Sequence, residues 1–136
     1  MEIPHNKDAE EAVLACCING GDANIFETSQ PLLSPKDFYF EDHLLVWESM
    51  CELSSESTTI DLITVTERVT SKNPSMRLTT MEISDKVHTS VGLMNYIDII
   101  LKKSQLRAMR REYMTALDKI KEDKDPQVIQ DDITRE

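Results

Sequence analysis

The chain has few of the residues that break helices or build turn-rich β structure. Its 136 residues include only three glycines and five prolines. β-Sandwiches, β-barrels and low-complexity tails are rich in such residues, so this composition disfavours all three. No apolar run approaches the ~20 residues of a membrane-spanning helix, and the N-terminal sequence lacks the charged and apolar regions of a signal peptide. The composition therefore predicts an all-α protein of the cytoplasm, with no membrane contact.

Sequence patterns that carry chemistry are also absent. The three cysteines have no C-x-x-C spacing, which is typical of reduced thiols rather than of a disulfide framework. The three histidines, at positions 5, 43 and 88, are far apart in sequence. No G-x-x-x-x-G-K-[ST] loop is present to cradle a nucleotide phosphate. We therefore expect no catalytic, cofactor-binding or metal-binding residues in this chain.

The formal net charge of −10 is unevenly distributed. Residues 102–121 hold seven basic and two acidic residues, a net charge of +5. Residues 122–136 hold two basic and six acidic residues, a net charge of −4, so the first 101 residues carry −11. Because nucleic-acid binding depends on neutralising phosphates, we expect no direct DNA binding by this acidic chain. The short basic segment fits a solvated helix face better than a nucleic-acid patch.

Short helices are predicted throughout the first 90 residues, because apolar residues recur there at helical spacing. Asn6 and Asp61 each precede such a segment, as N-caps do. The segment 34–37 combines a serine N-cap, a proline at N1 and an acid at N3. The segment 79–82 has the pattern of a capping box, which predicts another helix beginning there. Together these segments predict a small helical head over residues 1–90.

A helix over about residues 41–54 places His43 on the same face as Trp47 and Met50. A histidine there can be a ligand or a proton switch, but a core side chain held by a neighbouring backbone group or carboxylate is the more common case. We expect the second. Glu10 and Glu11 are adjacent in the first helix, so they should point to different parts of its surface and form no catalytic pair.

The longest helical pattern runs from Ser90 to about Lys124. Its apolar residues recur at intervals of seven, which is typical of a coiled-coil-like contact. Such a helix is longer than the head is wide, so part of it should project and need a partner. We call five of its residues the apolar seam, with Arg110 on the flank, and predict that they bind a partner: Leu106, Met109, Tyr113, Leu117 and Ile120. Proline 126 restarts a helix, so residues 91–136 should form a long helix and a truncated helical hairpin.

Several motifs stand in a characteristic order. They are Pro4-His5-Asn6, Ala9-Glu10-Glu11-Ala12-Val13-Leu14, Asp37-Phe38-Tyr39 followed by His43, and Ile60-Asp61-Leu62-Ile63-Thr64. Their order and spacing resemble the N-terminal domain of replicative DNA helicases of the DnaB family, over roughly residues 4–113. The segment 95–100 and Arg107 also look like that family's approach to its hairpin. The chain departs from the family pattern at residues 15–18, at Thr79-Thr80 and in the short return arm.

The resemblance implies a collar domain whose hairpins pair two protomers, build a hexamer and receive primase. It implies that the apolar seam and Arg110 bind a second copy or primase. It also implies that the parent protein is a bacterial ATP-dependent DNA helicase, that ATP and Mg²⁺ belong to that parent, and that this chain is not itself an enzyme. The helicase-binding domain of a primase is an alternative with a similar architecture, but segment 60–64 favours the helicase. A helix-turn-helix DNA binder would need a basic recognition helix, which the acidic residues 1–101 do not offer.

Overall fold

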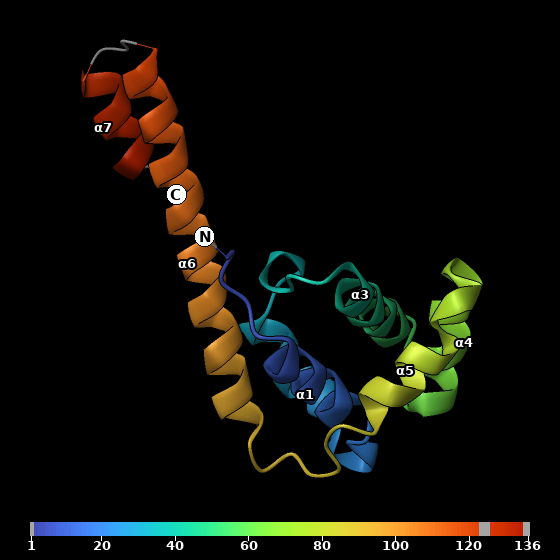
Figure 1. The fold of residues 1–136 in the computed structure, drawn as a ribbon. Coiled ribbons are helices and arrows are strands. Elements are labelled where there is room, and N and C mark those ends of the chain that lie inside the picture. The colour runs from blue at the N-terminus through green and yellow to red at the C-terminus, as the bar shows by residue number, and fades with distance from the viewer. Residues whose placement is uncertain (1, 123–125, 135–136) are drawn as a thin grey trace.

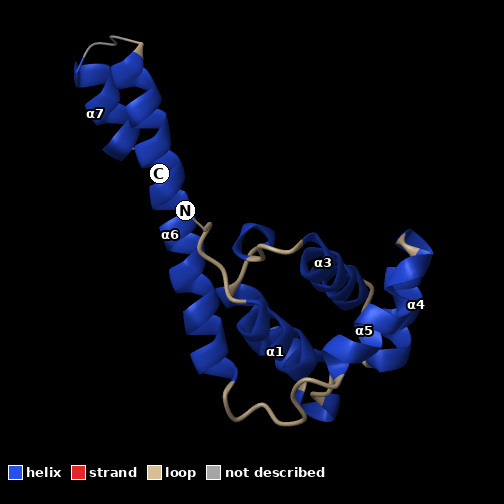
Figure 2. Ribbon diagram, viewed as in Figure 1, coloured by secondary structure: helices blue, strands red, loops and turns tan. Residues whose placement is uncertain are grey.

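The computed structural model describes residues 2–122 and 126–134, and within these ranges it contains helices and loops but no strand. The helices are α1 (Lys7–Ile18), α2 (Ile25–Ser29), α3 (Glu41–Ser55), α4 (Leu62–Lys72), α5 (Arg77–Ser84), α6 (Leu93–Lys121) and α7 (Pro126–Thr134). Four 3₁₀ turns connect them: η1 (Gly21–Ala23), η2 (Gln30–Leu32), η3 (Pro35–Asp37) and η4 (Pro74–Met76). The predicted all-α fold is confirmed (Figure 2).

Helices α1 to α5 form a head that packs against the first half of α6 (Figure 1). The second half of α6 projects beyond the head, and α7 folds back along it. The expected long helix is therefore present, although it spans Leu93–Lys121 rather than Ser90 to Lys124. Lys124, the expected end, lies outside the described residues.

The core of the head is built around Trp47, which is 1% exposed. Its ring lies 4.9 Å from that of Phe26 and 5.2 Å from that of Phe38, measured between centroids. Phe26 comes from α2 and Phe38 from the loop before α3, so one indole joins three segments. Val46 and Met50 on α3 are also buried, which confirms the predicted inner face of this helix.

Three of the four helix starts predicted from capping patterns are found in the structure. Asn6 and Asp61 cap α1 and α4, and a capping box closes η3. The predicted helix start at 79–82 is wrong, because α5 begins at Arg77. There Asn73 accepts from the backbone N–H of Ser75 and Pro74 opens η4, which runs directly into α5. The N-terminus of this helix was therefore set by an upstream Asn-Pro pair, not by the threonines.

Helix α6 has two unlike halves. Leu93, Ile97 and Ile100 are buried against the head, where α6 packs mainly on α1. Beyond Arg107, the only buried residue in the described part of α6 is Ala116, on the stretch that α7 accompanies. At about 1.5 Å per residue, the part of α6 beyond Arg107 extends roughly 20 Å from the head. A projection of this kind leaves most of its side chains in solvent.

Candidate functional site

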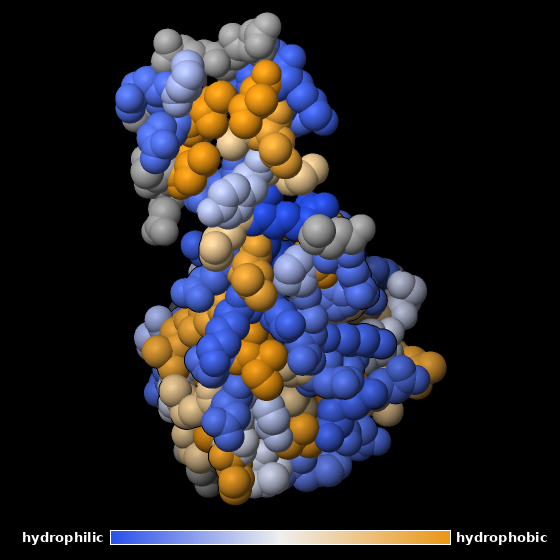
Figure 3. All heavy atoms as spheres, turned by 60° about the vertical axis from the view of Figure 1, so that its left-hand side comes forward, coloured by the Kyte–Doolittle hydropathy of each residue, from blue (hydrophilic) through white to orange (hydrophobic). Residues whose placement is uncertain are grey.

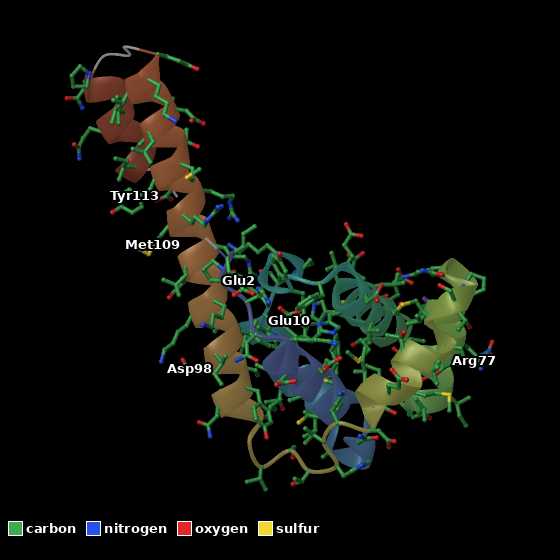
Figure 4. The ribbon with its side chains drawn as sticks, in the orientation of Figure 1. Glu2, Glu10, Arg77, Asp98, Met109 and Tyr113 are labelled. Atoms are coloured by element: carbon green, nitrogen blue, oxygen red, sulfur yellow. The ribbon has the colours of Figure 1, made fainter. Side chains whose placement is uncertain are left out.

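The apolar seam lies on the projecting half of α6 and is exposed along its whole length. Its five side chains are between 46% and 58% exposed: Leu106, Met109, Tyr113, Leu117 and Ile120. Met114, 46% exposed, lies on the same half and extends the apolar surface. Figure 4 shows Met109 and Tyr113 directed away from the head, and Figure 3 shows hydrophobic side chains at the surface of the projecting α6–α7 hairpin. This run of exposed apolar side chains makes the seam the candidate interaction site of the chain.

A groove of about 800 Å³ lies between η3 and the side of α6 that faces it. Leu101, Ala108 and Met109 supply its apolar lining, and Lys36 and Arg111 stand among its polar residues. The groove and the seam share Met109, so they are adjacent surfaces on one helix. Both surfaces run along α6, the seam from Leu106 to Ile120 and the groove lining from Leu101 to Lys119.

The base of the projection is held by Arg107, a 7% exposed residue of α6. Its guanidinium donates hydrogen bonds to the carbonyl oxygens of Pro4 at 3.0 Å, Asp37 at 2.9 Å and Lys36 at 3.4 Å. It also lies over the ring of Tyr39, 5.6 Å from the centroid. The planar fork of an arginine can bind several acceptors at once. Arg107 thereby ties α6 to both the N-terminal segment and the loop before α3.

Asp37 also holds the loop before α3 to α6, so it strengthens the junction between the head and the long helix. Its Oδ1 accepts a hydrogen bond of 2.7 Å from the Ser104 hydroxyl on α6. Its Oδ2 accepts from the backbone N–H of Ser34 at 2.8 Å and from its hydroxyl at 3.1 Å. The carboxylate that completes the capping box of η3 therefore also holds α6. This double role explains why an acid stands at that position.

The sequence contained a signal for this junction that periodicity alone did not reveal. Five positions of α6 follow alternating steps of four and three residues: Leu93, Ile97, Ile100, Ser104 and Arg107. Such steps keep to one side of a helix. The last two members are polar, so a search for apolar spacing ends at Ile100. The structure shows that the buried stripe continues to Arg107 through hydrogen bonds.

A second buried polar cluster joins α1 to α3. Nδ1 of His43 lies 2.9 Å from Oε1 of Glu10, and Nε2 lies 3.5 Å from Oε2 of Glu11. Glu10 also accepts hydrogen bonds from the backbone N–H groups of Tyr39 and Phe40. The expected core role of His43, held by a carboxylate, is confirmed. Glu10 and Glu11 leave α1 in different directions, as expected, but both are buried and reach opposite sides of one imidazole.

The glutamates converge because α1 is itself enclosed. Ten of its residues, from Ala9 to Ile18, are buried. Adjacent side chains on such a helix differ by about 100°, but both directions here lead into protein, and the imidazole lies between them. The ring separates the two carboxylates, so the arrangement is a bridge between helices.

The described residues include no further cluster of side chains that is arranged for chemistry. Cys16 and Cys17 are buried and Cys51 is half-buried, all as free thiols. No set of three or more His, Cys, Asp and Glu side chains within residues 2–122 and 126–134 is arranged to hold a metal ion. Of the helices described, none is both long and apolar enough to cross a membrane.

The family model of the DnaB-like helicase N-terminal domain matches residues 2–102. The chain belongs to this family. The match covers the head and the first half of α6, including the segment 60–64 that favoured a helicase over a primase. The matched residues end before Ser104 and Arg107, which hold α6 to the loop before α3.

Two curated relatives are replicative helicases. The chain is 27% identical over 112 residues to the replicative DNA helicase DnaB of Geobacillus stearothermophilus, covering 79% of this chain and 24% of that protein. It is 28% identical over 116 residues to the replicative DNA helicase DnaC of Bacillus subtilis (strain 168), covering 82% of this chain and 25% of that protein. The chain thus spans about a quarter of the length of these relatives.

The fold also matches a solved structure of the DnaB family. The crystal structure of the N-terminal domain of DnaB helicase from Mycobacterium tuberculosis aligns with a TM-score of 0.83 at 18% identity. The alignment covers 97% of this chain and 98% of that one. The likeness therefore includes the projecting part of α6, which lies beyond the residues matched by the family model.

Proposed function

We propose that this chain acts as the N-terminal collar domain of a bacterial replicative DNA helicase and joins helicase subunits through the α6–α7 hairpin. The observation that carries the proposal is the exposed apolar seam on the projecting half of α6. A seam with this spacing is suited to pairing with another helix. Family membership supports the assignment to a helicase. The assembly would form a hexamer in the whole protein, which works in the cytoplasm.

The proposal divides the work between this chain and the rest of the helicase. The sequence has no phosphate-binding loop of the P-loop type, so ATP and Mg²⁺ would be bound elsewhere in the whole protein. The role of this chain would be assembly and docking. Its −11 charge over residues 1–101 would keep the head away from DNA phosphates.

Primase is the proposed second partner. The exposed seam, with Arg110 on its flank, is the surface on which we place a helical domain of primase. A titration of a labelled primase helicase-binding domain, followed by fluorescence anisotropy, tests this. Saturable binding that weakens on Arg110→Glu and Met109→Asp supports docking at this region. Binding that both variants leave unchanged would place primase elsewhere.

Sedimentation equilibrium tests self-association directly. The chain should form concentration-dependent dimers, and Tyr113→Asp with Leu117→Asp should make it monomeric, because each charge enters a contact that excludes water. Ile63 and Leu78 on the head are 76% and 65% exposed, so Ile63→Asp with Leu78→Asp is a matched control. The control should associate like the original chain. A strictly monomeric original chain at millimolar concentration would overturn the proposed role.

A further inference from the structure

Glu11 is a buried carboxylate that lies between an imidazole and an ammonium group without a short contact to either. Its side chain is 8% exposed. Oε2 lies 3.5 Å from Nε2 of His43, and Oε1 lies 3.8 Å from Nζ of Lys86. Oε1 has no hydrogen-bond partner among the described residues. Because an ionised carboxylate that is removed from water needs close partners, Glu11 should respond when either neighbour changes.

The two neighbours of Glu11 belong to different parts of the head. His43 lies on α3 and its side chain is 4% exposed, whereas Lys86 lies in the loop between α5 and α6 and its side chain is 49% exposed. This loop is already tied to the end of α1, because Nδ2 of Asn19 donates a hydrogen bond of 2.9 Å to the carbonyl oxygen of Val87. Lysine has a flexible four-carbon stem. The ammonium of Lys86 can therefore close the gap to Glu11 while the backbone of the loop stays on α1.

The number of protons on His43 decides how well Glu11 is held. Nδ1 lies 2.9 Å from Oε1 of Glu10, a shorter distance than the 3.5 Å from Nε2 to Glu11. A doubly protonated ring has one N–H for each carboxylate, whereas a neutral ring has a single N–H. The shorter contact favours keeping that proton on Nδ1, so the lone pair of Nε2 then faces Glu11. Lys86 is then the only cation within 4.0 Å of Glu11 in residues 2–122 and 126–134.

The charged groups that face this cluster come from three segments. Glu10 and Glu11 face His43 from α1, and Lys86 approaches from the loop after α5. Glu10 also accepts hydrogen bonds from two backbone N–H groups of the loop before α3, so it stays paired whatever the ring does. In the part of the chain that the structure describes, no other side chain of opposite charge lies within 4.0 Å of these groups. A change of charge on His43 therefore falls on Glu11 and Lys86.

We propose that Glu11 is a proton-controlled switch: when His43 loses its second proton, Lys86 moves onto Glu11 and draws the loop between α5 and α6 against α1. At lower pH the imidazolium holds Glu11, and the ammonium of Lys86 stays in solvent. The loop ends where α6 begins, at Leu93. The switch thus acts on the segment through which the head leads into the long helix, and it is independent of the proposed assembly role.

Urea denaturation of the original chain and of Lys86→Met tests the proposal at a pH on each side of the His43 titration, which NMR of the ring locates. Lys86→Met removes the charge, and the fall in urea midpoint that it causes should be at least about twofold larger on the alkaline side. Lys102→Met is the matched control, because it breaks an exposed ion pair of 3.1 Å with Asp98. It should shift the midpoint equally on both sides. In a Glu11→Gln background, the pH dependence of the Lys86→Met effect should disappear, because a neutral amide does not need the cation.

A larger loss on the alkaline side that disappears with Glu11→Gln supports the proposal. Equal losses on both sides, a larger loss on the acidic side, or a pH dependence that survives Glu11→Gln overturns it. NMR of the original chain keeps the test valid if Glu11→Gln does not fold. There the nitrogen signal of Lys86 Nζ should change along the same titration curve as the His43 ring. A Lys86 signal that ignores this titration, or a ring that does not titrate between about pH 5 and pH 9, also overturns the proposal.

Discussion

The guanidinium of Arg107 donates a hydrogen bond of 3.0 Å to the carbonyl oxygen of Pro4, which precedes it by 103 residues. The same group binds the carbonyl oxygens of Lys36 and Asp37. One side chain thus joins the N-terminal segment, the η3 turn and α6. Because the projecting half of α6 begins at this point, Arg107 helps to hold the angle at which the head presents the apolar seam.

Replacing Arg107 should weaken this junction. Arg107→Ala leaves three carbonyl oxygens without their donor, and we expect the free energy of unfolding to fall by about 1.5–3 kcal/mol. Arg107→Lys should recover only part of this loss, because a lysine cannot bind the three oxygens with a planar fork. Urea denaturation gives the values. Arg111→Ala, at an exposed neighbouring position, is the control and should change stability by less than about 0.5 kcal/mol. Equal losses of stability at positions 107 and 111 would show that the hydrogen bonds of Arg107 do not hold α6 to the head.

The core prediction concerns Trp47. Trp47→Ala removes a ring that contacts Phe26 and Phe38, and large-to-small aromatic changes cost about 3–5 kcal/mol. We expect a large downward shift of the urea midpoint. Tyr113→Ala removes an aromatic ring that is 53% exposed on the projection and should leave the head nearly as stable as before. An unchanged midpoint for Trp47→Ala would mean that the indole does not hold the head together.

Much of the fold could be predicted because its determinants are local. Asn6, Asp61 and the 34–37 segment act within one turn of their own helices, and Trp47 follows from periodicity on α3. Helix length and spacing also predicted that the seam would be exposed on the projecting part of α6, while its binding of a partner stays a prediction. The start of α5 was missed because Asn73 and Pro74 outweigh a threonine pair that only resembles a cap.

The polar contacts between distant segments could not be read from the sequence. Arg107 binds Pro4 and Asp37, and His43 meets Glu10 across 33 residues. Sequence spacing describes one helix at a time, whereas these contacts depend on how α1, α3 and α6 cross. Their partners include backbone carbonyls, which every residue has, so no residue type marks them in advance.

The thiol of Cys17 should be nearly inert in the folded protein. Burial is the main cause that raises its pKa from 9.0 to about 12, partly opposed by a side-chain hydrogen bond with Ser29. The thiolate is the reactive form, so iodoacetamide at pH 8 should leave Cys17 unmodified while the half-buried Cys51 reacts slowly. Because this pKa is raised on folding, its contribution to stability is complete below pH 9 and is lost as the pH rises toward 12. Mass spectrometry of the alkylated chain identifies the sites, with the urea-unfolded protein as the control. Labelling of Cys17 as fast as Cys51 would show that the buried surroundings of Cys17 open in solution.

The bridge formed by Glu10, His43 and Glu11 gives the last prediction. The side chain of His43 is 4% exposed, and those of Glu10 and Glu11 are 2% and 8% exposed. A protonated imidazole has one N–H for each carboxylate, whereas a neutral one has a single donor. Glu10 keeps two backbone donors if the ring is removed, but Glu11 does not. Its Oε1 has no hydrogen-bond partner among the described residues, and Lys86 Nζ stays 3.8 Å away.

His43→Leu should therefore lower the free energy of unfolding by about 3–5 kcal/mol, because it leaves a buried carboxylate without its partner. Glu11→Leu alone should cost less, since Glu10 still holds the ring. In His43→Leu with Glu11→Leu the uncompensated charge is gone, so the double variant should be more stable than His43→Leu itself. Urea denaturation of the three variants and the original chain completes a double-mutant cycle. Additive losses would show that Glu11 and His43 do not interact, and the second half of the bridge would then be absent in solution.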